Sequence, residues 1–511
     1  MVTQKNMRKN KLAFGLTLLV TSLISGVVFA QQARQFPYSL PLTGDSKPDV
    51  ITEYFGVTDI PVPDERYSDR GIALTYKVGD REQTFTGFAL DEVEFTSEFG
   101  IIVEFKYAMI DGHTFNGRYG DGMTMFLYDS SKPFEIGGHG ASLGYAYRNS
   151  NYAGQDVPGL NGGYLGVGLD VYGDFKVRSQ AYGEKKEGID YNWSEIGSHV
   201  TIRGAQHLDN RYKGYPVLYT VNADNRWKIN RARLDYETGD YDYHEEQFTK
   251  LFDMRTEYDN QGNIRYNTVT VTIMPDPFDR GSEITVSVKD RYGEGDLVRK
   301  LLYPDHFKTR DQNGEVYDFE TKIPDNYKIG FAAGTGGAYQ IHLVKDVRIR
   351  LPYQPDTDDI RAQFCRGNNN NEGRQTRFDP FEDAYFYGGS VSWPTGGNSS
   401  YYIDYDSFRF EDEEGYSLND NNPFRYEQSG VGTWEYDGSR TVTFTASEDN
   451  ISEGEYSIYY SAKGVDRGDG PFGKEAYRSR PTKLTVVVQE CKRLTNPLLP
   501  IRIKIKEGEE D

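Results

Sequence analysis

Three motifs rich in glycine and aspartate, between residues 117 and 175, carry the side chains best suited to bind a polar ligand. The first contains Asp121, the second is a glycine-rich loop around His139, and the third alternates Asp170, Tyr172 and Asp174. The first and third adjoin short apolar runs of the kind that form buried strands. The pattern therefore predicts that polar loops meet at the rim of a β-sandwich and hold one ligand there.

The first two motifs contain the groups that a carbohydrate site needs. A sugar presents hydroxyl groups, which donate to a carboxylate and accept from backbone N–H groups that approach closely. Asp121 would supply the carboxylate, and Gly138 or Gly140 would allow the close approach because glycine has no Cβ. An aromatic ring would cover the apolar face of the sugar. The candidates for that ring are Tyr172, Tyr145 and His139. The plainer alternative is that Asp121 caps a strand and that the glycines only form turns.

The third motif could bind a cation. Asp170, Tyr172 and Asp174 alternate, so their side chains share one face of an extended chain. Two carboxylates and a backbone carbonyl on one face would suit a hard cation such as Ca²⁺. We therefore take these three residues as candidate calcium ligands.

The elements that must position these motifs are short strands. Forty tyrosines and 54 glycines among 511 residues favour strands joined by tight turns. The clearest strand patterns before residue 350 are 84–88, 92–95, 101–109, 123–127, 165–171, 199–203, 227–236, 268–274, 283–288, 327–333 and 339–349. Such a series predicts an all-β sandwich. Residues 245–255 are expected to form a short helix, within a charged stretch at 207–326 that has no assigned role.

A second all-β region follows a proline- and aspartate-rich stretch at 351–360, which is interpreted as a linker. Its strand patterns are 401–410, 432–436, 441–446, 455–462 and 483–488. We place this domain at 361–491, with Trp434 in its core, and treat 492–511 as a C-terminal tail. Cys365 and Cys491 could close a disulfide in an oxidising compartment, or remain two buried thiols.

The N-terminal segment and the net charge bear on where the protein acts. Residues 1–30 have a basic start, an apolar stretch and small residues at a cleavage position, which is typical of a secretory signal peptide. The alternative is a retained membrane anchor. No later stretch is long and apolar enough to span a membrane, so we expect a secreted, extracellular or cell-surface protein. A net charge of −20 disfavours nucleic acid as a partner.

Five motifs in order make residues 36–350 resemble the L-type (legume-lectin-like) family in its bacterial form. They lie at residues 120–127, 137–144, 169–174, 199–202 and 329–337. The resemblance implies a concanavalin-like jelly-roll sandwich. It also implies that sugar is bound through Asp121, a glycine of the second loop, Asp174 and the loop around Gly336, with calcium beside the sugar.

This resemblance has departures that bear on the metal. Gly168 stands where the family has a glutamate that binds a transition metal, and Asp174 replaces an asparagine. The separation between Asp174 and His199 is also longer than in the family. We therefore expect His199 to be a packed strand residue and not a metal ligand.

Residues 359–490 resemble the repeat domain of CshA-type fibril adhesins. The resemblance rests on residues 408–412, 430–436 and 441–445 and implies one spacer domain. The resulting hypothesis is a non-catalytic, lectin-like adhesin whose partner is a glycan or polysaccharide. One alternative is a glycoside hydrolase, although Glu92 and Glu94 lack the middle aspartate of the usual hydrolase strand. The other is a structural domain that has lost sugar binding.

Overall fold

The computed structural model describes most of the chain between residues 36 and 490. The described residues are 36–55, 66–76, 85–148, 156–176, 198–223, 228–247, 252–276, 278, 280–311, 315–366, 375–382, 384, 403–447, 451–464 and 478–490. Within these ranges the regular structure consists of strands and one short 3₁₀ turn, and no helix there is long and apolar enough to cross a membrane. Two compact units are present. The N-terminal unit is Ser39–Ile349, and the C-terminal unit is Arg350–Asp511 with Met1–Tyr38.

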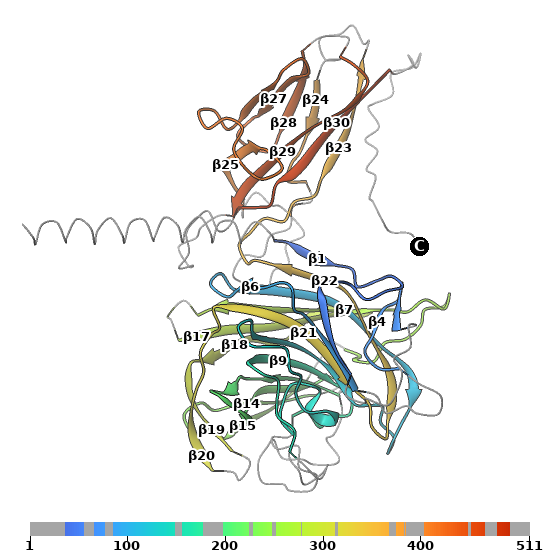
Figure 1. Ribbon diagram of the computed structural model, residues 1–511, viewed down its shortest axis with the longest axis vertical. Helices are drawn as coiled ribbons and strands as arrows, with labels where there is room; N and C mark the ends of the chain where they lie inside the picture. Colours follow the sequence, from blue (N-terminus) through green and yellow to red (C-terminus); the bar gives the residue numbers. More distant parts are fainter. Residues whose placement is uncertain are drawn as a thin grey trace, which may run out of the picture. The chain divides into compact units, whose positions relative to one another are not determined.

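Two large sheets form the N-terminal unit (Figure 1). The ten-stranded sheet has the order β15 (Tyr241–Gln247), β14 (Lys228–Leu234), β13 (Val217–Asn222), β10 (His199–Arg203), β9 (Gly163–Asp170), β8 (Gly122–Asp129), β21 (Asn326–Gly334), β5 (Phe85–Leu90) and β2 (Ile51–Phe55), with β6 (Phe95–Thr96) on β21. The eight-stranded sheet has the order β18 (Gly293–Pro304), β17 (Gly281–Asp290), β16 (Asn267–Pro275), β7 (Ile101–His113), β22 (Tyr339–Arg350), β4 (Gly71–Ala73) and β3 (Tyr67–Ser68), with β1 (Tyr38–Leu40) on β22.

Aromatic side chains join the two sheets face to face. The ring of Phe105 on β7 lies 5.0 Å from that of Phe331 on β21. The ring of Tyr164 on β9 lies 5.5 Å from that of Tyr303 on β18. Such pairs add to the free energy gained by burying the apolar area itself. The predicted all-β, jelly-roll sandwich is therefore confirmed.

Two local predictions for this unit were wrong. The expected helix at 245–255 begins inside β15, where residues 241–247 pair with β14 in an antiparallel ladder. Glu92 and Glu94 lie in an exposed turn and not on a strand. The stretch 207–326 also contributes strands to both large sheets, together with the hairpins β11–β12 (Gln206–His207 and Asn210–Gly214) and β19–β20 (His306–Arg310 and Val316–Glu320).

The middle of the ten-stranded sheet is buried on both faces. All eight residues of β9 are buried, because loop side chains cover the face that turns away from the other sheet. A Cβ on Gly166 would lie 2.6 Å from the Tyr145 ring, and one on Gly168 would lie 2.2 Å from the Phe175 ring. The strand glycines thus leave room for aromatic rings to lie flat on the sheet. This second layer fixes the loops that carry the candidate site.

The C-terminal unit is a smaller sandwich of two four-stranded sheets. Their orders are β23 (Ile360–Arg366), β30 (Thr482–Glu490), β29 (Gly454–Gly464) and β25 (Ile403–Glu411), and β24 (Gln375–Phe378), β28 (Val442–Ala446), β27 (Gly432–Tyr436) and β26 (Arg425–Gln428). The predicted core position of Trp434 is confirmed, since its side chain is fully buried against Phe378 and Phe444. Residues of the expected linker pack onto this unit: Gln354 donates to the Arg478 carbonyl, and Thr357 contacts Thr482.

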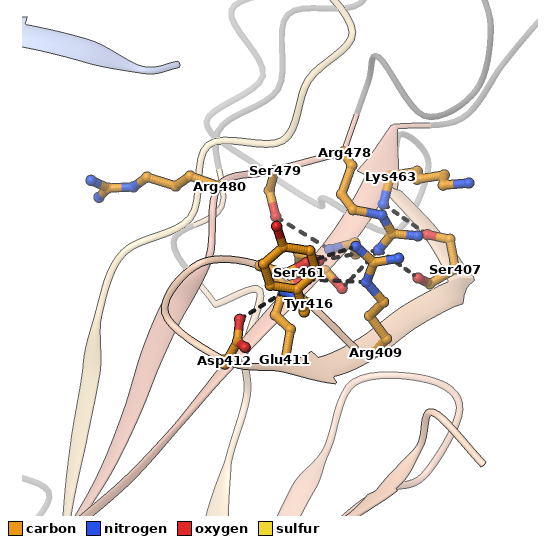
Figure 2. Close-up of polar contacts among 12 residues, drawn as sticks. Ser407, Arg409, Glu411, Asp412, Tyr416, Ser461, Lys463, Arg478, Ser479 and Arg480 are labelled. Carbon is orange, nitrogen blue, oxygen red and sulfur yellow. Dashed lines mark hydrogen bonds and ion pairs between the residues drawn. The ribbon is translucent and has the colours of Figure 1, made fainter. Parts of the chain in front are cut away.

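A buried polar cluster joins β25 and β29 in this unit (Figure 2). The fully buried Glu411 carboxylate accepts from Arg409 Nε at 3.0 Å and from Ser461 Oγ at 2.8 Å. Arg478 donates to the Ser407 carbonyl at 3.0 Å and to Ser461 Oγ at 3.1 Å. The buried carboxylate thus has an arginine and a hydroxyl as donors within the unit, which is typical of a structural cluster.

Several expectations concern residues that the structure does not describe. These are the signal peptide at 1–30, the tail at 492–511 and Cys491, together with the side chain of Cys365. The proposed disulfide therefore lies outside the described residues.

Candidate functional site

Asp121 is held between two loops of the N-terminal unit. It directly precedes β8, its N–H donates to the Gly334 carbonyl at 2.9 Å, and its carbonyl accepts from the Tyr172 N–H at 2.9 Å. These bonds tie the end of β21 and the loop after β9 to the same residue. The peptide bond between Gly120 and Asp121 is cis. The backbone of Asp121 is therefore fixed from both sides.

The Asp121 carboxylate faces glycines from two other loops. A Cβ added to Gly336 would lie 3.5 Å from Asp121 Oδ1 and 3.8 Å from Oδ2. One added to Gly334 would lie 3.7 Å from Oδ2 and 3.7 Å from the Gly140 nitrogen. A carboxylate and a backbone nitrogen thus approach the same space, which glycine leaves clear. The structure brings Asp121, Gly140 and Gly336 together although 215 residues separate the first from the last.

The two candidate glycines of the second loop have different surroundings. Gly138 is buried, its N–H donates to the Ala146 carbonyl at 2.8 Å, and its carbonyl accepts from Gly144. Gly140 begins the 3₁₀ turn η2 (Gly140–Ser142) with φ at +64°, and a Cβ there would meet no atom within 4 Å. Gly138 therefore shapes the loop, while Gly140 is the glycine that borders open space.

The candidate aromatic rings are mostly closed to a ligand. Tyr145 is fully buried and donates to the Gly204 carbonyl, and Tyr172 is only 6% exposed, with the Arg118 guanidinium 5.7 Å above its ring. His139 is exposed, and its ring lies 6.0 Å from that of Phe85. Of the three predicted rings, only His139 can meet a sugar.

An aromatic side chain that the sequence did not single out lies beside the same loops. Phe115 is 49% exposed, and its ring lies 3.2 Å from the place where a Cβ on Gly337 would stand. Gly337 adjoins Gly336, which faces the Asp121 carboxylate. A backbone bridge between Phe115 and Arg118 closes the turn that carries the ring. The only signal for Phe115 is its exposure next to a glycine-rich turn, which the structure shows and the sequence alone does not.

Three carboxylates influence one another at this rim. Withdrawal from water, and then the charge of Asp174, raises the pKa of Asp121 to about 7, against the opposing effect of Arg148. The same two causes raise the pKa of Asp170 to about 8. Desolvation and the Arg148 guanidinium lower the pKa of His139 to about 4, so its ring is neutral at pH 7. Arg148 is only 6% exposed and was not predicted.

The loop after β9 does not have the ligand arrangement expected for calcium. Asp170 Oδ1 accepts from the Gly173 N–H at 2.8 Å and Oδ2 from the Phe175 N–H at 2.6 Å, so both oxygens stabilise the loop itself. Among the described residues, no group of three His, Cys, Asp or Glu side chains is arranged to hold a metal ion. Both Asp170 oxygens are thus engaged by the loop, and the calcium ligands expected at Asp170, Tyr172 and Asp174 stay a prediction.

An ammonium group occupies this part of the rim. Lys176 is only 4% exposed, and its Nζ lies 2.9 Å from Nε2 of His199. His199 on β10 stands opposite Asp170 on β9 in the register of the two strands. The Lys176 charge acts to lower the pKa of Asp170. The Phe175 ring meanwhile fills the space over Gly168, where a longer side chain would clash. The chain thus places its own cation among the carboxylates.

Comparisons with known proteins give likenesses of structure. No protein-family model and no curated protein sequence matches the chain. The exoplasmic/lumenal domain of VIP36, solved with Ca²⁺ and Man3GlcNAc, is 11% identical with a TM-score of 0.31, over 61% of this chain and 87% of that one. Lectin I-B4 from Griffonia simplicifolia, in a metal-free form, is 11% identical with a TM-score of 0.31, over 61% and 97%. The Bauhinia forficata lectin in complex with GalNAc is 13% identical with a TM-score of 0.30, over 61% and 97%. At such identities the likeness concerns the fold alone.

Proposed function

We propose that the N-terminal unit binds a glycan at the rim around Asp121, and that the protein is an exported, non-catalytic, lectin-like adhesin. The observation that carries this proposal is the convergence of the Asp121 carboxylate and the Gly140 nitrogen on space that Gly334 and Gly336 leave clear. Two neighbouring hydroxyls of a sugar need an acceptor, a donor and room to approach them. Here these are the carboxylate, the backbone N–H and the space beside the glycines.

Each residue of the rim has a distinct role in this proposal. Asp121 accepts hydrogen bonds from two hydroxyls, and Gly140 donates from its backbone. His139 covers an apolar ring face from one loop, and Phe115 covers another part of the saccharide. Asp174 lies behind these groups, where its charge acts on Asp121. Tyr172 supports Asp121 through its N–H and not through its ring.

Glycan binding on this proposal needs no added calcium. Lys176 supplies positive charge beside Asp170 and His199, and Asp170 already bonds two backbone N–H groups. Chelator should therefore leave glycan affinity unchanged. A loss of binding in chelator that Ca²⁺ restores would instead favour the calcium site at Asp170, Tyr172 and Asp174.

A glycan array with Asp121→Asn tests the proposal. The substitution keeps the size of the side chain and removes its charge, so binding should fall at least about tenfold, as expected for a lost charge-assisted hydrogen bond. Asp129→Asn is the matched control because Asp129 ends the same strand, eight residues away. Equal binding by wild type and Asp121→Asn would overturn the site. Absence of binding by the wild type to any glycan would favour a structural domain that has lost its ligand.

A hydrolase is the second candidate, and one observation favours it. Desolvation and the charge of a second carboxylate, that of Asp174, raise the pKa of Asp121 to about 7. The general acid in a catalytic pair of carboxylates also has a raised pKa. Incubation with a polysaccharide panel and assay of reducing ends separates the two functions. Release of reducing sugar that Asp121→Asn abolishes would replace the lectin proposal.

For the C-terminal unit we propose the role of a spacer. The buried Glu411 carboxylate is bonded by Arg409 and Ser461 of the same unit, and Trp434 is enclosed in the core. Deletion of this unit should leave glycan affinity unchanged if the N-terminal unit folds without it. Loss of binding by a folded N-terminal unit would contradict the spacer role.

A further inference from the structure

A large cleft in the N-terminal unit has no role in the site described so far. Its volume is about 1060 Å³, which is just above the range of roughly 300–1,000 Å³ usual for ligand pockets. Four segments line most of it, namely residues 117–119, 253–257, 265–268 and 289–291. The last three belong to the charged stretch 207–326, to which the sequence assigned no role and which could cover the sheet or form a second binding surface.

The charge of the cleft is opposite to that of the protein. Five basic side chains line it, Arg118, Arg255, Arg265, Lys289 and Arg291, against three acidic ones, Asp253, Glu257 and Asp290. The lining therefore has an excess of two positive charges in a chain of net charge −20. A local excess of this sign attracts anions even when the whole molecule is acidic.

Ion pairs inside the cleft occupy part of its acidic groups. Arg291 contacts Asp253 at 2.6 Å and also pairs with Glu257, which Arg265 approaches at 3.7 Å. Asp290 accepts from the backbone N–H groups of Asp253 and Tyr292. These pairs balance Arg265 and Arg291 against Asp253 and Glu257. The excess of two positive charges is therefore carried by Arg118, Arg255 and Lys289, with Asp290 as the remaining acidic group of the lining.

Two further basic side chains are held in place by aromatic rings. The Arg255 guanidinium lies 3.3 Å from the centroid of the Tyr119 ring and donates to the Asp111 carbonyl at 2.7 Å. The Arg118 guanidinium lies over Tyr172. Guanidinium groups that are fixed by stacking lose less entropy when they bind an anion.

The cleft and the Asp121 site share a wall. Tyr119 lines the cleft and stands two residues before Asp121, which is at most about 7 Å along the chain. Val171 also lines it and directly precedes Tyr172, whose N–H bonds to Asp121. One extended ligand could therefore contact both places.

We propose that the cleft is a second subsite, which takes the anionic group of an acidic polysaccharide while a neighbouring sugar occupies the Asp121 site. The anionic group is a uronate carboxylate or a sulfate ester, because both accept the parallel N–H bonds that guanidinium groups donate. This inference rests on the proposed function, and it names the class of glycan. Neutral glycans would fill the Asp121 site alone.

Titration calorimetry with three oligosaccharides of equal length tests the inference: one neutral, one with a uronate and one with a sulfate ester. Wild type should bind an anionic member at least about tenfold more tightly than the neutral one, and added salt should weaken only the anionic binding. The two anionic arms identify the group that is preferred. Equal affinity for all three would overturn the inference while leaving the Asp121 site intact.

The double variant Arg265→Gln with Lys289→Gln removes the excess of two positive charges from the cleft. It should lower the affinity for the anionic oligosaccharide to that of the neutral one. Arg299→Gln is the control, because Arg299 is 66% exposed and does not line the cleft. An unchanged preference in the double variant would overturn the cleft assignment. Asp121→Asn should weaken all three ligands, and anionic binding that survives it unchanged would contradict the shared site.

Discussion

The two units bury carboxylates in opposite ways. In the C-terminal unit, Glu411 is fully buried and receives hydrogen bonds from Arg409 and Ser461 (Figure 2). At the rim of the N-terminal unit, Asp121 and Asp170 both lie in the field of Asp174, and each has a raised pKa. A buried charge that its neighbours neutralise serves the fold, whereas carboxylates that repel one another are costly for the fold and indicate a ligand.

Among the substitutions, the largest expected loss of stability comes from breaking the Glu411 cluster. Glu411→Ala would leave the Arg409 charge without the carboxylate and the Ser461 hydroxyl without its acceptor, and should reduce the free energy of unfolding of the C-terminal unit by about 3 kcal/mol. Urea unfolding measures the change. Glu427→Gln is the control, since Glu427 is exposed on β26. A loss below about 1 kcal/mol would mean that the cluster is not structural.

Removing the ammonium of Lys176 should have the next largest effect. Lys176→Met keeps the length of the buried side chain but leaves Asp170 beside Asp174 without the added positive charge. A lost hydrogen bond to a charged group predicts a destabilisation of about 2 kcal/mol. Thermal melting with and without Ca²⁺ measures it. Wild type should melt at the same temperature in chelator, and a fall there would contradict the role of Lys176.

The pH dependence of stability should follow the raised pKa values at the rim. Because Asp121 and Asp170 have pKa values of about 7 and about 8 in the folded chain, they keep protons that the unfolded chain releases near pH 4. Their stabilising contribution is complete below pH 4 and is lost as the pH rises to about 8. The slope is at most about 1.4 kcal/mol per pH unit for each proton. Urea unfolding at a series of pH values checks this.

Substitution of Asp121 isolates its share of that slope. Asp121→Asn should flatten the decline, and Asp129→Asn should not. Glycan affinity should change in the other direction, rising through pH 7 as Asp121 ionises and becomes a better acceptor. A stability that rises between pH 4 and pH 8 would contradict the proposed carboxylate cluster.

The smallest effect compares one glycine from each unit. Gly140 and Gly430 have φ values of +64° and +71°, and a Cβ on either would meet no atom within 4 Å. Alanine at either position should therefore cost a similar, small amount of stability, about 1 kcal/mol, from the left-handed backbone alone. Only Gly140→Ala should also weaken glycan binding, which a binding assay at one glycan concentration detects. Equal binding by both variants would remove Gly140 from the site.

The sequence predicted the positions of strands better than it predicted which side chains are exposed. The strand expected at residues 101–109 lies within β7, where most of its side chains are buried. The predicted rings of Tyr145 and Tyr172 proved buried. Tyr145 packs over Gly166 of β9 and Tyr172 packs against Gly120, and no periodicity reveals either contact. The helix expected at 245–255 was wrong because pairing with β14 outweighs local propensity there.

For the candidate site, the resemblance supplied Asp121, Gly140 and Gly336, which the fold brings together. It did not supply Arg148 or Lys176, because neither belongs to a motif. Arg148 acts to lower the pKa of Asp121, and Lys176 acts to lower that of Asp170. Both are found by looking in the structure for basic side chains near these two acids. The sequence shows which basic residues are present, but only the fold shows which of them lies near each acid.

The position of Lys176 has a consequence for where the protein can work. A positive charge on a covalent side chain has a local concentration that neither dilution nor sequestration can change, unlike that of an exchangeable ion. The rim would then keep its geometry in surroundings where divalent cations are scarce or are captured by acidic polymers. An acidic polymer that binds at the rim would then not remove a cation that the binding loop needs, because the ammonium group of Lys176 is part of the chain.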